Sequence, residues 1–562
     1  MQENNLLHQR VSTTEKLNSL VLPTYEKNWI HGVAITLYVL GIVNILSSLL
    51  SYTPSRLLLL KEVFEYQLIL GSRFIVLVTG IIAILVAPAL YRRKRVAWYI
   101  SVIILGCSGF AHIIKNIDVT EASVCILLLG IILPLFKYCS VKSDPLRTRQ
   151  GWKLLLTTLA FIIIYTFLGI QIFASELGFQ HNDIPFLSVW FNALLFDVSD
   201  LNPHGHAATF FTNSLLWING FALISGTILA LSPVIGASIP EKNLDLSKSI
   251  ASEHAIQPVQ SFILRKDYQH YLLQKDVFKG FMGYKISNGV AMGIGNPCAN
   301  SDPEELLNEW INFCIQHDWI PAIYQAKEDI FPILKKINFE YIPIGVEAVV
   351  NLETFTLKGK TMQKMRSALN KIEKSNWVVR EYKDSDWVKI EKLNQQWLDI
   401  HGEKEIGFAM GTASPDYLLS TRSMLLVDQE DNLLAYVNNV DLNGNNGRTI
   451  DLMRRSVDSP TGAMESLIVS EIVKAQEDGK AYYDLGFSPL AQIDETFTDN
   501  KIAVKLLKLI YDHQKRFYDF QGLHRFKSKY NPDWQYSYLV YPSALHLPKV
   551  LFALLQLNRK YS

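Results

Sequence analysis

Long apolar runs constrain the first 236 residues of this 562-residue chain more than any other feature of its sequence. A run of about 20 apolar residues can cross about 30 Å of hydrocarbon as a helix. Six stretches approach or exceed this length: residues 30–51, 71–91, 96–114, 119–137, 152–174 and 208–234. A shorter amphipathic segment, 186–196, is expected to lie at the interface or to re-enter. Residues 1–27 are polar and contain no signal-peptide core, so the sequence predicts a polar N-terminus and a transmembrane domain over 28–236.

The charges of the connecting loops predict how these helices are oriented. The sequence "RRKR" at 92–95 and the connection 137–153 are strongly basic, whereas 175–207 contains no Lys or Arg. We therefore expect the basic loops on the cytoplasmic side, and six helices then place both termini and the rest of the chain there as well. His112 and Glu121 alone bring ionisable groups close to membrane depth, so support for a transport pathway is faint.

The length of the chain exceeds that of one domain, since domains usually contain about 100–200 residues. A net charge of +1 identifies no class of partner. The five cysteines show no CxxC or paired spacing, and three of them lie in or beside apolar runs, where a buried free thiol is expected. The sequence therefore predicts neither a disulfide framework nor a metal site.

After a linker at 237–257, short strands alternate with helices in two similar passes. The turn "LNGNNG" lies between two apolar runs of the second pass and predicts a hairpin. A strand, a helix that starts at its end and another strand follow, which is the layout of acetyltransferase-like (GNAT) folds. We therefore expect an α-helical transmembrane bundle followed by a cytoplasmic α/β (α+β) domain of tandem acetyltransferase-like folds, with subdomains over 258–360 and 361–562.

The turn "RRSVDSPTGAM" at 454–464 occupies the place where ordinary members of that fold hold the pyrophosphate of coenzyme A with backbone N–H groups. Gly462 is present, but Pro460 removes one donor and no second glycine follows at close spacing. The sequence therefore predicts that the acyl donor is not an acyl-CoA, and no cofactor is expected.

The C-terminal region 501–562 is basic, with eleven Lys or Arg against three Asp, and aromatic residues are interleaved with the charges. This mixture suits a phosphate backbone together with stacking on unpaired bases. It suits the anionic inner leaflet equally well, and a solvated helix face is the third interpretation.

Several longer motifs in this half carry a resemblance to a known family. They are the stretch 323–374, "EKEIGFAMG" at 403–411, "IDLMRRS" at 450–456, "YYDLGFSPLA" at 482–491 and "LHRFKSKYNPDWQYSYLVYP" at 523–542. In this order they resemble the catalytic domain of the lysylphosphatidylglycerol synthase, or multiple peptide resistance factor, family. The stretch 92–123 is similar to the membrane segment that precedes that domain. Larger members have about fourteen membrane helices, so the resemblance implies a short form that lacks the N-terminal flippase helices.

The resemblance implies an enzyme that transfers an aminoacyl group from aminoacyl-tRNA to the glycerol head of phosphatidylglycerol. Lysyl-tRNA is the favoured donor, and the product would be a less anionic or cationic lipid that confers resistance to cationic antimicrobial peptides. The catalytic domain would face the cytoplasm at the bacterial cell membrane, with phosphatidylglycerol of the inner leaflet as acceptor. An alanyl donor, another lipid acceptor, a non-catalytic lipid-handling protein and a homo-oligomer are alternatives that the sequence leaves open.

Asp451 and Arg454 are the predicted catalytic residues. Asp451 would orient the lipid hydroxyl or the ammonium of the donor, and Arg454 would clamp a phosphate or the oxyanion, because a guanidinium binds such groups bidentately. Residues three apart on a flat strand face opposite sides, so both reach one site only if the strand bulges or ends there. The alternative is a buried Asp–Arg pair that holds the strand end.

The remaining predicted residues would bind substrate. Lys527 and Lys529 would share one face of an extended segment and contact a phosphate of tRNA or lipid, and Asp484 ends the strand after the helix. The family resemblance adds four more: Arg366 and Asn370, one helical turn apart near the cleft between subdomains, and Glu405 and Phe408 in an "E-x-G-F-x-x-G" stretch. Glu405 would recognise a cationic amino acid. For each of these residues a structural or solvated role is the competing interpretation.

Overall fold

The structure is a computed structural model. It describes residues 24–49, 66–116, 119–141, 145–177, 186–194, 203–231, 241–275, 277–360, 362–401, 408–489, 491–492 and 520–559. The chain divides into two compact units, the first comprising Met1–Ile235 with Ile315–Asp318 and the second the remaining residues up to Ser562. Each unit is described separately below.

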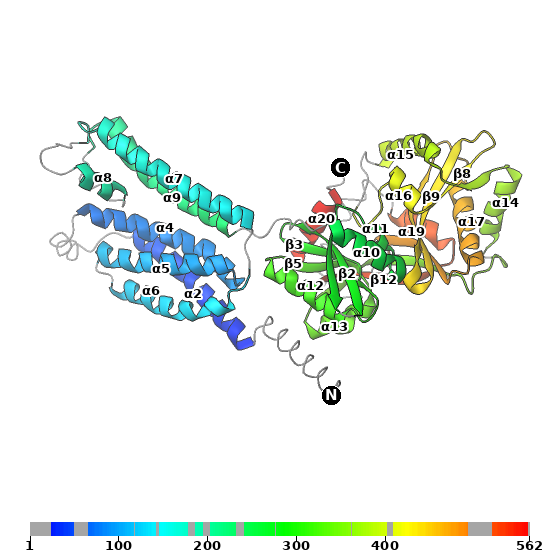
Figure 1. Ribbon diagram of the computed structural model, residues 1–562, viewed down its shortest axis with the longest axis horizontal. Helices are drawn as coiled ribbons and strands as arrows, with labels where there is room; N and C mark the ends of the chain where they lie inside the picture. Colours follow the sequence, from blue (N-terminus) through cyan, green and yellow to red (C-terminus); the bar gives the residue numbers. More distant parts are fainter. Residues whose placement is uncertain are drawn as a thin grey trace. The chain divides into compact units, whose positions relative to one another are not determined.

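The N-terminal unit is helical (Figure 1). Its helices are α2 (Thr24–Leu49), α4 (Tyr66–Tyr91), α5 (Arg95–Asn116), α6 (Val119–Ile132) with η1 (Leu133–Tyr138), α7 (Pro145–Ile172), α8 (Phe186–Leu194) and α9 (His206–Ala230). Within the described residues, three segments are long and apolar enough to cross a membrane: Asn28–Ser48, Arg95–Ile113 and Thr120–Tyr138. Helices α4, α7 and α9 overlap the other three predicted spans, for which crossing stays a prediction, and α8 overlaps the amphipathic segment.

A buried polar network connects α2 with α5 inside this unit. Asn44 Nδ2 donates a hydrogen bond to Ser108 Oγ over 2.8 Å, and Asn44 Oδ1 lies 3.0 Å from His112 Nε2. Polar side chains that bond across helices in this way hold a helical bundle together. His112 therefore lies within the helix packing.

The second unit contains a 12-stranded mixed sheet with the order β1-β2-β3-β5-β12-β6-β11-β10-β9-β8-β7, and β4 pairs with β2. The strands are β1 (Gln269–Lys275), β2 (Phe278–Ser287), β3 (Val290–Ile294), β4 (Cys298–Ala299), β5 (Ile320–Ala326), β6 (Glu340–Asn351), β7 (Val378–Glu381), β8 (Arg422–Val427), β9 (Leu433–Leu442), β10 (Gly447–Arg455), β11 (Tyr482–Pro489) and β12 (Asp533–Tyr541). The predicted fold class is confirmed. The predicted hairpin is present as β9 and β10, joined through Asn446 in the left-handed conformation (φ 53°).

The two successive series of strands and helices predicted from the sequence do not form two separate halves of the sheet. The C-terminal strand β12 pairs antiparallel with both β5 and β6, so it completes the first half from the far end of the chain. Part of the expected linker also belongs to the fold. Helix α10 (Glu241–His254) lies within 237–257 and buries Ile250 and Ala251 in the core, because its apolar face covers the sheet.

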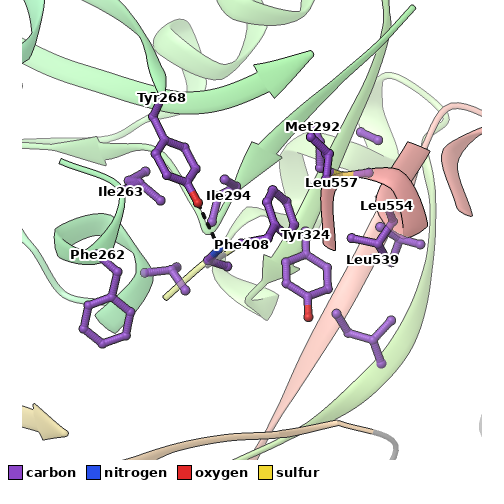
Figure 2. Close-up of a cluster of buried hydrophobic side chains, with 14 of the residues drawn as sticks. Phe262, Ile263, Tyr268, Met292, Ile294, Tyr324, Phe408, Leu539, Leu554 and Leu557 are labelled. Carbon is purple, nitrogen blue, oxygen red and sulfur yellow. Dashed lines mark hydrogen bonds between the residues drawn. The ribbon is translucent and has the colours of Figure 1, made fainter. Parts of the chain in front are cut away.

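The first core lies between the β1–β6 part of the sheet and α10, α11 (Pro258–Phe262) and α20 (Leu547–Arg559). Figure 2 shows this core, with the rings of Tyr324 and Phe408 next to each other and a hydrogen bond to the Tyr268 hydroxyl. That hydroxyl accepts the hydrogen bond from the backbone N–H of Ala409 at 3.0 Å. Helices α12 (Glu304–Gln316) and α13 (Phe331–Lys336) complete this half.

The second half of the sheet is covered on both faces (Figure 1). Helices α14 (Gln363–Lys374) and α17 (Ala463–Glu477) pack on one face. Helices α15 (Trp387–His401) and α16 (Pro415–Ser420) pack on the other. The strand β10 runs between these two layers, and the helix α19 (Phe520–Ser528) packs beside β11.

Candidate active site

Strand β10 contains a β-bulge at Asp451, where a bulge is needed if Asp451 and Arg454 are to reach one site. Its pairing with β9 changes register between Ile450 and Met453, so that two residues, Asp451 and Leu452, lie opposite one. Ile450 and Met453 pack towards α17, whereas Leu452 packs towards α15 and α16. The bulge therefore brings both Asp451 and Arg454 to the face covered by α15 and α16.

The Asp451 carboxylate is held by two donors. The backbone N–H of Gly411 lies 2.9 and 3.1 Å from its two oxygens, and the Tyr417 hydroxyl donates to Oδ2 at 2.6 Å. A Cβ at Gly411 would lie 2.0 Å from Oδ2, so only glycine allows this approach. Burial and the charge of Asp451 raise the pKa of Tyr417 well above its ordinary value, which keeps the hydroxyl protonated as a donor.

Arg454 lies against helix α15. Its Nη1 donates to Asn394 Oδ1 at 2.8 Å, and its guanidinium carbon lies 4.8 Å from the centre of the Trp397 ring. The Tyr436 hydroxyl donates to the same Asn394 oxygen at 2.7 Å. A buried guanidinium that stacks on an aromatic ring is fixed in orientation, and this suits a residue that clamps an anion.

Strands β10 and β11 separate just before Asp451. Their parallel pairing ends at Thr449↔Asp484, although both strands continue further. Lys527 fills the gap: its Nζ donates to the Phe487 carbonyl at 2.9 Å. A Cβ at Gly486 would lie 3.6 Å from this nitrogen and 3.7 Å from the Ile450 carbonyl oxygen, so one methyl group at this position would contact both atoms.

The prediction that Lys527 and Lys529 share one face of an extended segment is wrong. Lys527 lies in the last turn of α19 and is 3% exposed, whereas Lys529 follows the helix and is exposed. Residues two apart in a helix point in nearly opposite directions. Lys529 Nζ instead pairs with Glu465 at 2.7 Å, on the first turn of α17.

Two buried carboxylates and two lysines form a cluster of interacting charges on the β11 side of the gap. Asp484 accepts a hydrogen bond from the Gly486 N–H at 2.7 Å, and Glu347 pairs with Lys327 Nζ at 2.7 Å. Burial, and then the charge of Glu347, raise the pKa of Asp484 to about 7. Burial lowers the pKa of Lys527 to about 8, although Asp484 and Glu347 oppose this effect. Displaced pKa values of buried groups are frequent at functional sites.

Lys327 and Glu347 belong to this cluster but were not predicted from the sequence. Glu347 is an isolated acid within the apolar strand "YIPIGVEAVV", a pattern that indicates a buried charge with a purpose. Lys327 directly follows the last residue of β5. Their pairing depends on sheet register, which one sequence does not reveal.

The remaining predicted residues lie elsewhere. Arg366 Nη1 donates to the carbonyls of Leu357 and Gly359, so it holds a turn, and Asn370 is exposed on α14. Phe408 is buried in the first core beside Tyr324. Glu405 lies outside the described residues. Their roles in substrate binding stay predictions.

The described residues contain no group of three or more His, Cys, Asp or Glu able to hold a metal ion.

Helix α17 begins after Gly462, whose φ is +92°. Lys371 Nζ donates to the Thr461 carbonyl directly before it. A lysine therefore lies at the turn where coenzyme A would be held in ordinary members of the fold.

Substitution of Gly486 tests whether the gap between β10 and β11 is needed for activity. Its φ of +85° disfavours any other residue, and a methyl group there points towards Lys527 and Ile450. We expect Gly486→Ala to lower the free energy of unfolding by about 1–2 kcal/mol and to reduce activity by placing an apolar methyl group against the lysine amine. Gly479→Ala is the matched control, since φ is +73° there and nothing lies within 4 Å. Chemical denaturation and transfer assays should show similar stability losses for both variants but reduced activity only for Gly486→Ala.

Comparison with known proteins places these features in a family. Residues 248–541 match the family described as "Phosphatidylglycerol lysyltransferase, C-terminal". The phosphatidylglycerol lysyltransferase of Bacillus subtilis is 27% identical over 272 residues, which cover 48% of this chain and 31% of that protein. The corresponding protein of Staphylococcus epidermidis is 24% identical over 266 residues, covering 46% of this chain and 31% of its own length. The chain thus matches about a third of the length of these curated relatives.

One solved structure supports the fold. The structure of L-PGS from Bacillus licheniformis aligns with a TM-score of 0.50 and 22% sequence identity, covering 58% of this chain and 98% of that chain. At this level of identity the likeness concerns the fold alone.

Proposed function

The chain belongs to the phosphatidylglycerol lysyltransferase C-terminal family, and from this membership we propose that it transfers an aminoacyl group from aminoacyl-tRNA to the glycerol head group of phosphatidylglycerol. The observation that carries the proposal is the gap between β10 and β11. Asp451 and Arg454 lie on β10 beyond the point where its pairing with β11 ends, and the buried Lys527 is bonded to the Phe487 carbonyl of β11.

The reaction exchanges one ester for another. A glycerol hydroxyl of the lipid attacks the aminoacyl carbonyl, and the terminal ribose hydroxyl of tRNA leaves after taking up a proton. Asp451 would orient the attacking hydroxyl, and Arg454 would bind the lipid phosphate or the developing oxyanion. Lys527 is suited to accept the proton, because its lowered pKa of about 8 leaves part of the amine neutral near neutral pH. It can then return this proton to the ribose oxygen as the tRNA leaves.

The location of the reaction follows from its substrates. Three apolar segments of the N-terminal unit are candidate membrane spans, which suits an enzyme with a lipid acceptor. Since tRNA is found in the cytoplasm, the second unit would face the cytoplasm and take phosphatidylglycerol from the inner leaflet. Transfer of a lysyl group would convert an anionic lipid into a cationic one and weaken the attraction of cationic antimicrobial peptides.

The test uses the full chain in detergent with phosphatidylglycerol and tRNA charged with labelled lysine or alanine. We expect a labelled phospholipid that is retained after RNase treatment of the product but is not formed when RNase is added before the enzyme. Label in a lipid other than phosphatidylglycerol would show that the acceptor is a different lipid. Formation of product after RNase pretreatment would exclude tRNA as donor. If no lipid is labelled by any charged tRNA, the proposed function is wrong.

A further inference from the structure

Helix α20 carries apolar side chains on two opposite sides (Figure 1). One side belongs to the first core, and Figure 2 shows Leu554 and Leu557 of this side within that core. The other side faces outwards: Phe552 is 53% exposed, and Leu545, just before the helix, is 91% exposed. A helix that packs on a soluble core usually has polar residues on its outer side, so these exposed side chains indicate a further contact.

The exposed side chains form one continuous stripe. Leu545, Pro548 and Phe552 are all exposed and follow one another at intervals of three and four residues. Leu545 lies in the turn that leads into α20, where the N–H of Leu547 donates to the carbonyl of Ala544. Residues at these intervals share one face of a helix, so the three side chains lie together, and we call them the outer stripe.

An exposed apolar residue that stands alone has no such meaning. Val277 in the turn between β1 and β2 is 83% exposed, and charged residues flank it in the sequence "KDVFK". Single exposed apolar residues of this kind are ordinary on protein surfaces. Val277 is therefore a suitable reference for the outer stripe, with similar exposure but no apolar neighbour at helical spacing.

The sequence around the outer stripe is basic. Residues 542–562 contain no Asp or Glu, whereas Lys549, Arg559 and Lys560 are basic, and Lys549 is exposed. Exposed Leu and Phe beside Lys or Arg are typical of helices that lie on an anionic membrane, with the apolar groups at the boundary of headgroups and acyl chains. Helix α20 has 13 residues and is about 20 Å long, too short to cross about 30 Å of hydrocarbon.

The size of the outer stripe favours a lipid surface over a second copy of the chain. Three side chains offer roughly 200–300 Å², whereas a stable protein interface buries about 800 Å² on each partner. A bilayer needs no matching surface. Three segments of the same chain are candidate membrane spans, and a tether to the bilayer raises the effective concentration of lipid beside the second unit.

We propose that the outer stripe docks the second unit on an anionic lipid surface, with Leu545 and Phe552 entering the headgroup boundary and Lys549 at the phosphates. The contact would restrict how the second unit turns at the bilayer. Such docking concerns the bilayer as a surface, so it does not depend on which group the site transfers.

The experiment measures how deeply a spin label at the outer stripe lies in lipid. The full chain is placed in nanodiscs of phosphatidylglycerol and phosphatidylcholine, in a Cys107→Ser background, because the other four cysteines are buried. A nitroxide is attached at Leu545→Cys, at Phe552→Cys or, as the control, at Val277→Cys. Electron paramagnetic resonance then compares relaxation by oxygen, which concentrates in lipid, with relaxation by a nickel chelate, which stays in water.

We expect oxygen to dominate at positions 545 and 552 and nickel to dominate at 277. In nanodiscs of phosphatidylcholine alone the ratio of oxygen to nickel at 545 should fall by roughly twofold or more, because the attraction of Lys549 to anionic lipid is lost. Nickel accessibility at 545 and 552 equal to that at 277 would overturn the proposal. Dipolar broadening between labels of two copies would also overturn it, since a second copy would then cover the stripe. An equal ratio in both kinds of nanodisc would overturn the preference for an anionic surface.

Discussion

Replacing Arg454 with alanine is expected to lower the rate of lipid aminoacylation by about 100- to 1,000-fold, the range seen when one donor to a developing oxyanion is removed. The guanidinium is buried against Trp397 and bonded to Asn394, so its position is set before substrate binds. Arg454→Lys should recover little of the loss, because an ammonium neither stacks nor binds an anion bidentately. Initial rates with labelled aminoacyl-tRNA and phosphatidylglycerol measure the effect.

A control is needed because Arg454 also contributes to packing. Arg380 on β7 provides it, since its two Nη atoms pair with Asp386 at 2.7 Å in the same half of the sheet but away from the gap. Arg380→Ala should lower thermal stability and leave the rate per folded molecule unchanged. If Arg454→Ala loses stability to a similar degree but retains activity, Arg454 is a structural residue of the α15 layer.

The second large effect is expected for Lys527→Met, which retains the length of the side chain and removes its amine. Loss of a proton acceptor should reduce transfer by about 100-fold or more. The substitution also removes a buried charge whose desolvation outweighs its attraction to Asp484 and Glu347, so the free energy of unfolding near pH 7 should change little. Denaturation curves and transfer rates on the same preparations separate the two effects.

The pH dependence of stability follows from the direction of each shift. The folded-state pKa of Asp484, about 7, lies above its ordinary 3.8, so its ionisation destabilises the fold progressively as pH rises from 3.8 to 7. The folded-state pKa of Lys527, about 8, lies below its ordinary 10.5, so its unfavourable contribution is full below pH 8 and disappears as pH rises to 10.5. Lys527→Met should therefore remove this unfavourable contribution below pH 8 and lose that advantage as pH rises to 10.5.

Two further variants decide what Lys527 does. Lys527→Arg keeps a positive charge that never becomes neutral, so it should restore phosphate binding but not proton transfer. Activity in Lys527→Arg close to that of the unaltered chain would show that Lys527 acts by charge alone. Lys529→Met should change little, since Lys529 is exposed and paired with Glu465 at the surface.

Local patterns of the sequence were sufficient to predict much of this architecture. Apolar runs and strand–helix alternation depend on residues close in sequence, and the structure has helices or strands at nearly all of them within its described residues. The need for a bulge beside Asp451 was also predictable, because two functional side chains three apart on a strand require one. Gly411 ends the "E-x-G-F-x-x-G" stretch, but its contact with Asp451 was not predicted.

Long-range register was not predictable from the sequence. Glu347 and Asp484 are neighbours because β6 and β11 pair across more than a hundred residues of sequence, and Val349, not Glu347, is the direct partner of Asp484. Lys527 was misplaced because its segment was read as a strand, whereas α19 turns that side chain inward. A helix and a strand of the same composition direct neighbouring side chains differently.

The place of β12 has a consequence for how the protein is made. Strands β5 and β6 leave the ribosome about two hundred residues before β12, which lies between them in the finished sheet. Until the last part of the chain has been synthesised, these two strands have open edges that favour pairing with other chains. A chain truncated before Asp533 would lack the strand that joins β5 to β6, so we expect such products to aggregate at the membrane or to be degraded. Completion of the C-terminus is therefore the event that commits the polypeptide to its native state.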